Sequence, residues 1–86
     1  MVGIEVEFTD EGEDDLNTLD KPIRKRVIEK IRWLAKNLSN IKPKPLSYEW
    51  EDFYKLRVGD WRVAYRVKNK IKVIIHRIKL RDKMYK

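Results

Sequence analysis

The most constraining feature of this chain is the alternation of apolar and charged side chains between residues 53 and 78. A period of two is typical of strands that bury one face and expose the other. Two short turns, Gly59-Asp60 and Asn69-Lys70, divide the stretch into segments 53–58, 61–68 and 71–78. Because connections this short join antiparallel neighbours, the sequence predicts a meander of three antiparallel strands.

The two faces of the predicted meander differ in chemistry. One face collects apolar side chains that are expected to pack beneath helices: Tyr54, Leu56, Val58, Trp61, Val63, Tyr65, Val67, Ile71, Val73 and Ile75. The opposite face presents mainly basic side chains: Lys55, Arg57, Arg62, Arg66, Lys68, Lys72 and His76, with Ala64 and Ile74. Like charges on neighbouring strands destabilise a sheet. We therefore interpret this face as a binding surface, against the alternative of a surface that only confers solubility.

The first half of the chain is predicted to form one strand and two helices. Residues 4–8 alternate like a strand, and Asp10 with Glu13 resembles a capping box at the start of a short helix. A second helix starts at the N-cap Asp20, carries Pro22 in its first turn and ends at residues 37–40. Its apolar positions have helical spacing: Ile23, Val27, Ile28, Ile31, Leu34, Ala35 and Leu38. Segment 41–50, which contains two prolines, is predicted to be a connecting loop.

These elements predict an α+β fold of order β-α-α-β-β-β, with two N-terminal helices packed on a small, mainly antiparallel twisted sheet. At 86 residues, the chain is expected to form a single domain over residues 1–86. It has no cysteine and one histidine, so we expect no disulfide, metal site or cofactor. The longest apolar run has three residues and nothing resembles a signal peptide, which favours a cytoplasmic protein without a membrane partner.

Charge is unevenly distributed along the chain. Residues 1–20 contain eight carboxylates and no lysine or arginine, whereas residues 21–86 contain all 21 basic residues and six acidic ones. The first helix was expected to expose most of its acidic side chains rather than to cover the cationic face. Because phosphates neutralised by cations release their counterions, the basic part of the chain predicts a polyanionic partner, with nucleic acid as the first candidate.

The central segment of the chain resembles a known motif. Residues 54–67 read Tyr-Lys-Leu-Arg-Val-Gly-Asp-Trp-Arg-Val-Ala-Tyr-Arg-Val, similar to the Y-R-L-R-x-G-D-Y-R-x-x-Y pattern of the RelE/ParE toxin superfamily. The C-terminal Arg81-Asp82-Lys83-Met84-Tyr85 resembles the closing R-x-x-x-Y of that family. The resemblance covers essentially the whole chain. It implies a RelE-like fold with a short C-terminal helical turn, and a toxin that a cognate antitoxin holds inactive.

RelE-type members are ribosome-dependent mRNA interferases, in which the ribose 2′-OH attacks the adjacent phosphate without a metal. The resemblance assigns catalysis to Lys55, Arg62, Arg81 and Tyr85. The two arginines would clamp the phosphate, since a guanidinium can hold two oxygens. Lys55 or Tyr85 would transfer the proton, and as a base either needs a pKa lowered by nearby cations. Further RNA contacts, to message on the ribosome and to rRNA, are predicted for Arg57, Arg66, Lys68, Lys72, Lys79 and Lys83.

Two alternatives stay open at this stage. ParE-type members share the fold and act on DNA gyrase, although Tyr85 with the two arginines favours a ribonuclease. A weakened member that only binds RNA or antitoxin is the other alternative. It is suggested by Lys79-Leu80, where many members have Gly-His, and by Phe53, where active enzymes tend to have lysine.

Some of these residues also have a purely structural interpretation. Arg62 could form an ion pair with Asp60, and Trp61 could pack in the core. His76 is expected to be a surface or edge residue rather than a general base. Trp33, if exposed, would be available to stack on a nucleobase.

Overall fold

The computed structural model describes residues 5–38, 44–45 and 53–84. Its elements follow in the order β1 (Glu5–Phe8), α1 (Asp10–Thr18), α2 (Lys21–Lys36), β2 (Lys44–Pro45), β3 (Tyr54–Val58), β4 (Trp61–Lys68), β5 (Lys72–Leu80) and α3 (Arg81–Met84). The predicted α+β order is confirmed. The one added element, β2, lies in the segment predicted to be a loop, and its proline is tolerated because the strand forms a sheet edge.

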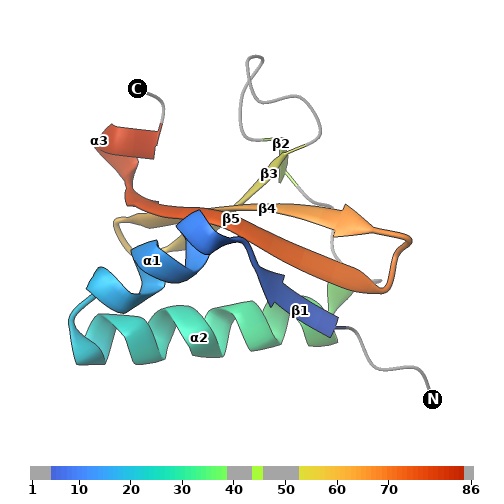
Figure 1. Cartoon of the computed structure of the whole chain (residues 1–86), viewed down its shortest axis with the longest axis horizontal. Coiled ribbons are helices and arrows are strands. Elements are labelled where there is room, and N and C mark those ends of the chain that lie inside the picture. The colour runs from blue at the N-terminus through green and yellow to red at the C-terminus, as the bar shows by residue number, and fades with distance from the viewer. Residues whose placement is uncertain (1–4, 39–43, 46–52, 85–86) are drawn as a thin grey trace.

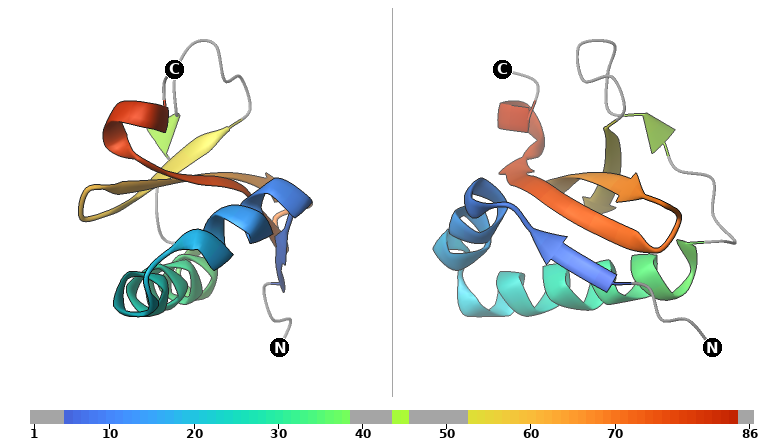
Figure 2. Two further views of the ribbon diagram at one scale, coloured as in Figure 1. Left: turned by 60° about the vertical axis from the view of Figure 1, so that its left-hand side comes forward. Right: turned by 45° about the vertical axis from the view of Figure 1, so that its right-hand side comes forward.

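The strands form one twisted sheet of order β1-β5-β4-β3-β2. Strands β3, β4 and β5 make the predicted antiparallel meander, and β1 joins the free side of β5 in parallel. Helices α1 and α2 lie on one side of the sheet, whereas α3 stands on the other side (Figures 1 and 2). We call the sheet face that points away from α2 the outer face.

The core lies between α2 and the inner face of the sheet. Pro22 stands in the first turn of α2 as predicted, whereas Asp20 occupies the N-cap position without a side-chain hydrogen bond to the helix. The apolar stripe of this helix meets the inner side chains of β3, β4 and β5 in one cluster: Leu19, Val27, Ile31, Leu34, Leu56, Val63, Tyr65, Val73, Ile75 and Ile78. Trp61 is partly buried against this cluster, which confirms its packing role.

The prediction that Ile71 belongs to the core is wrong, because its side chain is 45% exposed. Ile71 closes the turn that precedes β5, and its backbone N–H donates to the carbonyl of Lys68. Asn69 and Lys70 both have positive φ angles of 55° and 63°, which matches the twist that a tight hairpin needs. Ile71 therefore belongs to the turn and lies beyond the reach of α2.

A bulge interrupts β5. The pairing with β4 shifts by one residue between Ala64 and Tyr65, so no β4 residue lies opposite His76. An extra residue in one strand reverses the alternation of the side chains that follow it. Ile75 and Ile78 are accordingly both buried in the core, although three positions separate them. The regular alternation predicted over residues 71–78 therefore ends at His76.

Helix α1 is attached to the edge of β5 beyond the end of β1. Its N-cap is Thr9 rather than Asp10, since the Thr9 hydroxyl accepts a hydrogen bond from the N–H of Gly12 at 3.0 Å. The same hydroxyl lies 3.4 and 3.2 Å from the carbonyl oxygens of Ile75 and His76, which act as acceptors. Thr9 thus serves both the helix and the sheet edge, which explains why the predicted capping box is displaced by one residue.

Gly12 allows this close approach of α1 to β5. A methyl group at this position would collide with the backbone carbonyl of Ile75. We expect Gly12→Ala to lower the free energy of unfolding by about 2 kcal/mol through overpacking, despite the better helix propensity of alanine. Urea unfolding should be compared with Asn17→Ala, an exposed position of the same helix. Equal unfolding midpoints for the two variants would contradict the close contact.

Candidate nucleic-acid interface

The pairing of the strands places three basic residues in one row across the outer face. Arg57 on β3 lies opposite Arg62 on β4, and Arg62 lies opposite Lys79 on β5. Three adjacent cations repel one another. The structure relieves this repulsion differently at each position, and this difference decides which side chains remain available to an anionic ligand.

The guanidinium of Arg62 is turned toward the backbone of the β3–β4 turn. Its Nη1 donates to the carbonyl oxygens of Gly59 and Trp61, both at 2.9 Å. The side chain forms no ion pair with Asp60, and the residue is only 7% exposed. Arg62 therefore differs from the exposed outer-face cation that the alternation predicted. In this position, Arg62 holds the β3–β4 turn in place through its two hydrogen bonds.

The position of Arg62 gives a prediction that separates structure from catalysis. Arg62→Ala removes both hydrogen bonds to the turn, so we expect it to lower the free energy of unfolding by about 1–3 kcal/mol. Arg57→Ala, at the exposed neighbouring position, should change stability by less than about 0.5 kcal/mol. Thermal unfolding of the two variants measures the difference. If Arg62→Ala unfolds like the wild-type protein, its guanidinium is free for a ligand and does not hold the turn.

The basic residues of β5 are neutralised by the acidic N-terminal segment. Lys72 Nζ lies 3.0 Å from a Glu7 carboxylate oxygen and 3.7 Å from one of Glu5. The hydrogen bond that Lys72 donates to the Glu7 carboxylate is the largest contribution that raises the pKa of Lys72. On the next part of the strand, Arg77 Nη1 lies 2.7 Å from Glu11 Oε2. As expected, the acidic residues of α1 other than Asp15 are exposed, yet exposure does not prevent Glu11 from pairing with Arg77.

Asp15 is the centre of this acidic contact. Its Oδ2 accepts hydrogen bonds from the backbone N–H of Ile78 at 2.9 Å and from Arg77 Nε at 2.8 Å, and Lys79 Nζ lies 3.2 Å from Oδ1. Burial by itself raises the pKa of Asp15, but the hydrogen bonds from Arg77, Ile78 and Lys79 outweigh burial and lower it. The Asp15 carboxylate therefore replaces a neighbouring strand at the edge of β5.

The short helix α3 continues directly from β5 and lies on the outer side of the sheet. The N–H of Arg81 donates to the carbonyl of Asp60 at 2.9 Å, which ties α3 to the β3–β4 turn next to Arg62. Arg81 and Lys83 are exposed, and neither forms an ion pair with a described residue. Tyr85, the fourth predicted catalytic residue, lies outside the described part of the chain.

The middle of the outer face contains an aromatic contact. The rings of Phe53 and His76 meet edge to face, with their centroids 4.7 Å apart. Ala64, which is fully buried, belongs to the strand between them, and its small side chain leaves room for this contact. Burial and the nearby charge of Arg66 lower the pKa of His76, so its imidazole is neutral at neutral pH. His76 is thus a half-buried packing residue rather than the open edge residue that was expected.

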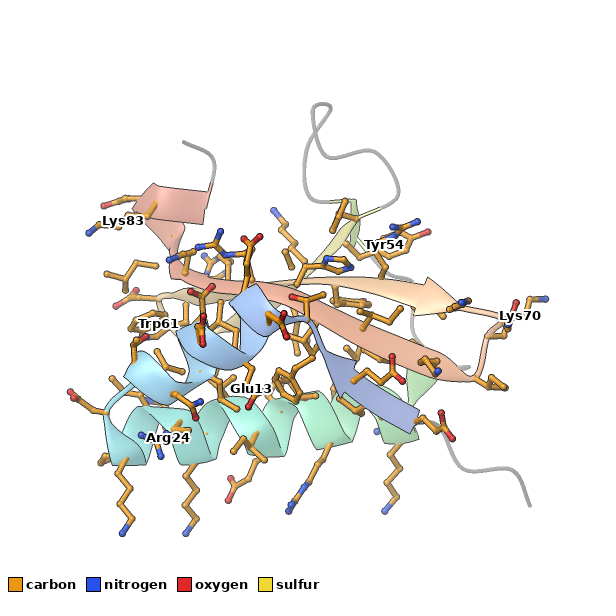
Figure 3. All side chains as sticks on the ribbon, in the orientation of Figure 1. Glu13, Arg24, Tyr54, Trp61, Lys70 and Lys83 are labelled. Atoms are coloured by element: carbon orange, nitrogen blue, oxygen red, sulfur yellow. The ribbon has the colours of Figure 1, made fainter. Side chains whose placement is uncertain are left out.

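The predicted site residues therefore separate into three groups. Arg57, Arg66, Lys68, Arg81 and Lys83 are exposed and Lys55 is half-buried, whereas Lys72 and Lys79 are held by carboxylates and Arg62 by backbone carbonyls. Lys83 lies at the α3 end of the sheet, at the opposite end from Lys70 in the β4–β5 turn (Figure 3). Of the exposed cations, Arg81 and Lys83 lie on α3, and Arg57 lies in the same row of the sheet as Lys79, two positions before Arg81. Within the described residues, no helix is long and apolar enough to cross a membrane.

One protein family matches almost the whole chain. The family model "ParE toxin of type II toxin-antitoxin system, parDE" matches residues 6–85. The chain belongs to the RelE/ParE toxin superfamily. It is therefore a toxin of the type II toxin-antitoxin class, as the central motif predicted. No curated protein matches the chain significantly.

Solved structures agree with this membership. The toxin-antitoxin complex RelBE2 from Mycobacterium tuberculosis contains a chain with 30% identity and a TM-score of 0.79, with 94% of each chain covered. The RelB-RelE complex from Methanococcus jannaschii has a chain with 25% identity and a TM-score of 0.68, covering 92% of this chain and 94% of the other. The ParDE system of Pseudomonas aeruginosa, with 19% identity, a TM-score of 0.69 and coverage of 90% and 95%, shares the fold.

Two contributions to this surface were not found by sequence reasoning. Asp15 was taken as one of several exposed acidic residues, and Arg77 was not considered at all. The only signal in the sequence is the reversed alternation after Ile75, which brings Ile78 into the core and implies a bulge. Asp15, which accepts a hydrogen bond from Ile78 on the bulged strand, lies more than sixty positions away from it in the sequence. No local pattern connects such distant residues.

Proposed function

We propose that this protein is a RelE-type mRNA interferase, which cleaves message on the ribosome. The observation that carries this proposal is the group of exposed cations at the α3 end of the outer face, where Arg57, Arg81 and Lys83 come from β3 and α3. Exposed cations grouped in this way attract the phosphate backbone of RNA. Two of the solved structures cited above have more than 20% identity to this chain. Both are RelE-type complexes, which supports the same activity.

The reaction needs stabilisation of a crowded, negatively charged phosphorane. The ribose 2′-oxygen attacks the adjacent phosphorus, its proton passes to a base, and the 5′-oxygen leaves with a proton from an acid. In this proposal Arg81 and Arg57 hold the phosphoryl oxygens, because each guanidinium can donate two hydrogen bonds. Lys55, as an ammonium, protonates the leaving oxygen, and Tyr85 is the proposed base. Arg62 is a positioning residue that holds the turn to which α3 is bonded.

The direct test is to map the 5′ ends of messages in a translating extract with and without the protein. We expect new ends within codons of ribosome-bound message, together with a cyclic phosphate on the upstream fragment. The same protein added to purified gyrase should leave supercoiling unchanged. Intact message with inhibited supercoiling would overturn the proposal.

A second candidate function is inhibition of DNA gyrase. Two observations favour it: the matched family model describes ParE toxins, and Arg62 is buried where an interferase would expose a phosphate ligand. A member that binds RNA or antitoxin without cleavage is the remaining alternative. The extract and gyrase measurements together separate all three, because a binding-only member would affect neither message nor supercoiling.

A cognate antitoxin is the proposed protein partner, since the similar structures include RelB-RelE complexes. The available cations of the outer face would pair with an acidic segment of that antitoxin. Internal carboxylates already neutralise β5, so the antitoxin would act on β3, β4 and α3. Rising salt is therefore expected to weaken the complex.

A further inference from the structure

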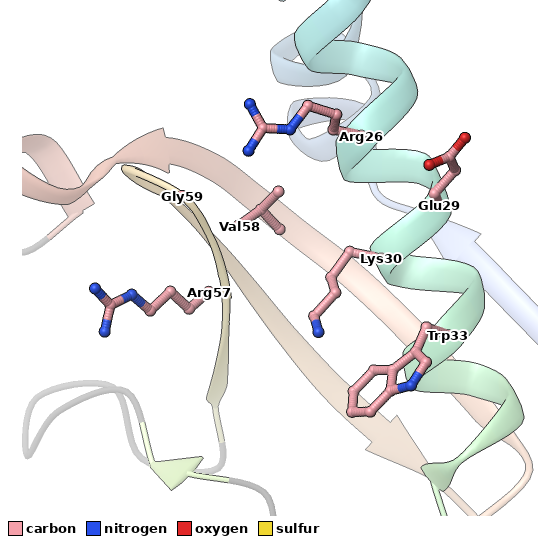
Figure 4. Close-up of a pocket in the computed structure, with 7 residues that line it drawn as sticks. All are labelled: Arg26, Glu29, Lys30, Trp33, Arg57, Val58 and Gly59. Atoms are coloured by element: carbon pink, nitrogen blue, oxygen red, sulfur yellow. The ribbon is translucent and has the colours of Figure 1, made fainter.

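A second basic surface adjoins the proposed cleavage site at Arg57 and extends into a groove between α2 and the β3–β4 turn. The groove has a volume of about 440 Å³, and its walls are Arg26, Lys30 and Trp33 from α2 and Arg57, Val58 and Gly59 from β3 and the turn (Figure 4). Among the described residues of the lining, Glu29 is the only carboxylate. Three cations against one carboxylate make this described lining positively charged, and the proposed chemistry of the outer face uses only Arg57 of it.

Trp33 gives this groove an aromatic surface. The residue is 43% exposed, although most tryptophans are largely buried. The ammonium of Lys30 lies over the indole, 4.0 Å from the ring centroid, and holds the ring beside the groove. Across the groove, the guanidinium of Arg26 lies close to the turn. If Gly59 carried a Cβ atom, that atom would lie 3.5 Å from Arg26 Nη2. An exposed aromatic plane between cations matches a stacking platform for an unpaired base.

The groove is continuous with the outer face through β3. Arg57 lines the groove, yet its side chain points away from α2 while that of Val58 points toward it (Figure 4). Strand β2 pairs only with Tyr54 and Lys55, and no described strand covers the edge of β3 beyond Lys55. Arg57 and Trp33 line the same groove, and no described strand separates them, so a single strand of nucleic acid that contacts Arg57 could also reach Trp33.

We propose that this groove binds single-stranded RNA that flanks the segment held on the outer face. Trp33 stacks on one unpaired base, while Arg26 and Lys30 contact neighbouring phosphates. The inference rests on the proposed function for its choice of RNA as ligand. Single-stranded RNA is favoured over duplex, because only an unpaired base offers its face to an aromatic side chain. It is favoured over an apolar protein segment, because charged side chains make up most of the lining.

The test uses 2′-O-methyl RNA, which lacks the attacking hydroxyl and is not cleaved. Affinity is measured by fluorescence anisotropy with oligonucleotides of about 6 and about 14 nucleotides. We expect Trp33→Ala to weaken binding of the longer oligonucleotide by roughly 5- to 100-fold and to change that of the shorter one little. Trp33→Tyr should restore most of the affinity. Ile71→Ala is the matched control, since Ile71 is a similarly exposed apolar residue that does not line the groove.

The charged residues give an independent measurement. Arg26→Ala should reduce the slope of log affinity against log salt by about 0.7, the value for one phosphate contact on a single strand. Lys25→Ala is the control, because Lys25 is exposed on the same helix but does not line the groove. Thermal unfolding of each variant confirms that the fold is retained.

Two results would overturn the inference. One is equal RNA affinity of Trp33→Ala and Ile71→Ala. The other is a Trp33→Ala variant that keeps its RNA affinity and loses its antitoxin, since the groove would then be a protein-binding site. Failure of the proposed function looks different. In that case message stays intact with the wild-type protein, while binding of the 2′-O-methyl RNA still depends on Trp33.

Discussion

Asp15→Ala is expected to lower the free energy of unfolding by about 3 kcal/mol, the largest effect on stability that we predict for a single substitution. The change removes the acceptor of the buried Ile78 N–H and leaves Arg77 and Lys79 without this carboxylate. For a chain of this size, the melting temperature should fall by about 15 °C. Circular dichroism during heating measures the change.

The control for Asp15→Ala is Asp14→Ala, which removes an equal charge from an exposed position of the same helix. We expect its stability to lie within about 0.5 kcal/mol of the wild-type value. Asp15→Asn should be intermediate, because the amide oxygen can still accept from Ile78 while both ion pairs are lost. If Asp14→Ala and Asp15→Ala melt at the same temperature, Asp15 does not cap the edge of β5.

The same carboxylate predicts how stability depends on pH. The pKa of Asp15 in the folded protein lies below its ordinary value of 3.8. The stabilisation by Asp15 is therefore fully present above pH 3.8 and is lost as the pH falls through the lower, folded-state pKa. Wild type and Asp15→Asn should thus converge in stability at acid pH. A constant difference between them down to about pH 2 would contradict this linkage.

Arg81→Ala is expected to reduce the rate of message cleavage by roughly 100-fold or more, the usual effect of removing one group that stabilises an oxyanion. The side chain is exposed, and the hydrogen bond that ties α3 to Asp60 comes from the backbone N–H. Alanine keeps that bond, so the fold should be unaffected. Cleavage rates in the translating extract, measured beside the melting temperature, separate loss of chemistry from loss of structure.

Lys70→Ala is the matched control for Arg81→Ala, because Lys70 is an exposed cation at the opposite end of the sheet (Figure 3). It should retain cleavage within about threefold if only general attraction to RNA is changed. Arg81→Lys should recover little, because an ammonium cannot hold two phosphate oxygens in the same plane. If Arg81→Ala stays fully toxic while message remains intact, the result would support inhibition of DNA gyrase instead of message cleavage.

Much of the fold could be predicted from local patterns. The meander over β3, β4 and β5 follows from alternation and two short turns, and α2 follows from its apolar stripe and Pro22. The motif from Tyr54 to Val67 was sufficient to identify the superfamily. The candidate site was predicted only as a set of residues that face the same way, because alternation assigns a face but not a contact.

Local residue patterns are enough to predict the order of the elements, the buried stripe of α2 and the excess of cations after residue 20. Which of those cations remain available depends on how the chain folds around them. Arg62 turns to backbone carbonyls of its own turn, and Lys79 turns to Asp15, which lies on α1. The bulge at His76 shifts the end of β5 and thereby brings Lys79 to Asp15. Lys79 and Asp15 are so distant in sequence that their contact leaves no periodic signal and becomes visible only when β5 is packed against α1. The hydrogen bonds of Arg62 to Gly59 and Trp61 are local, but they depend on the shape of the folded turn, which alternation does not specify.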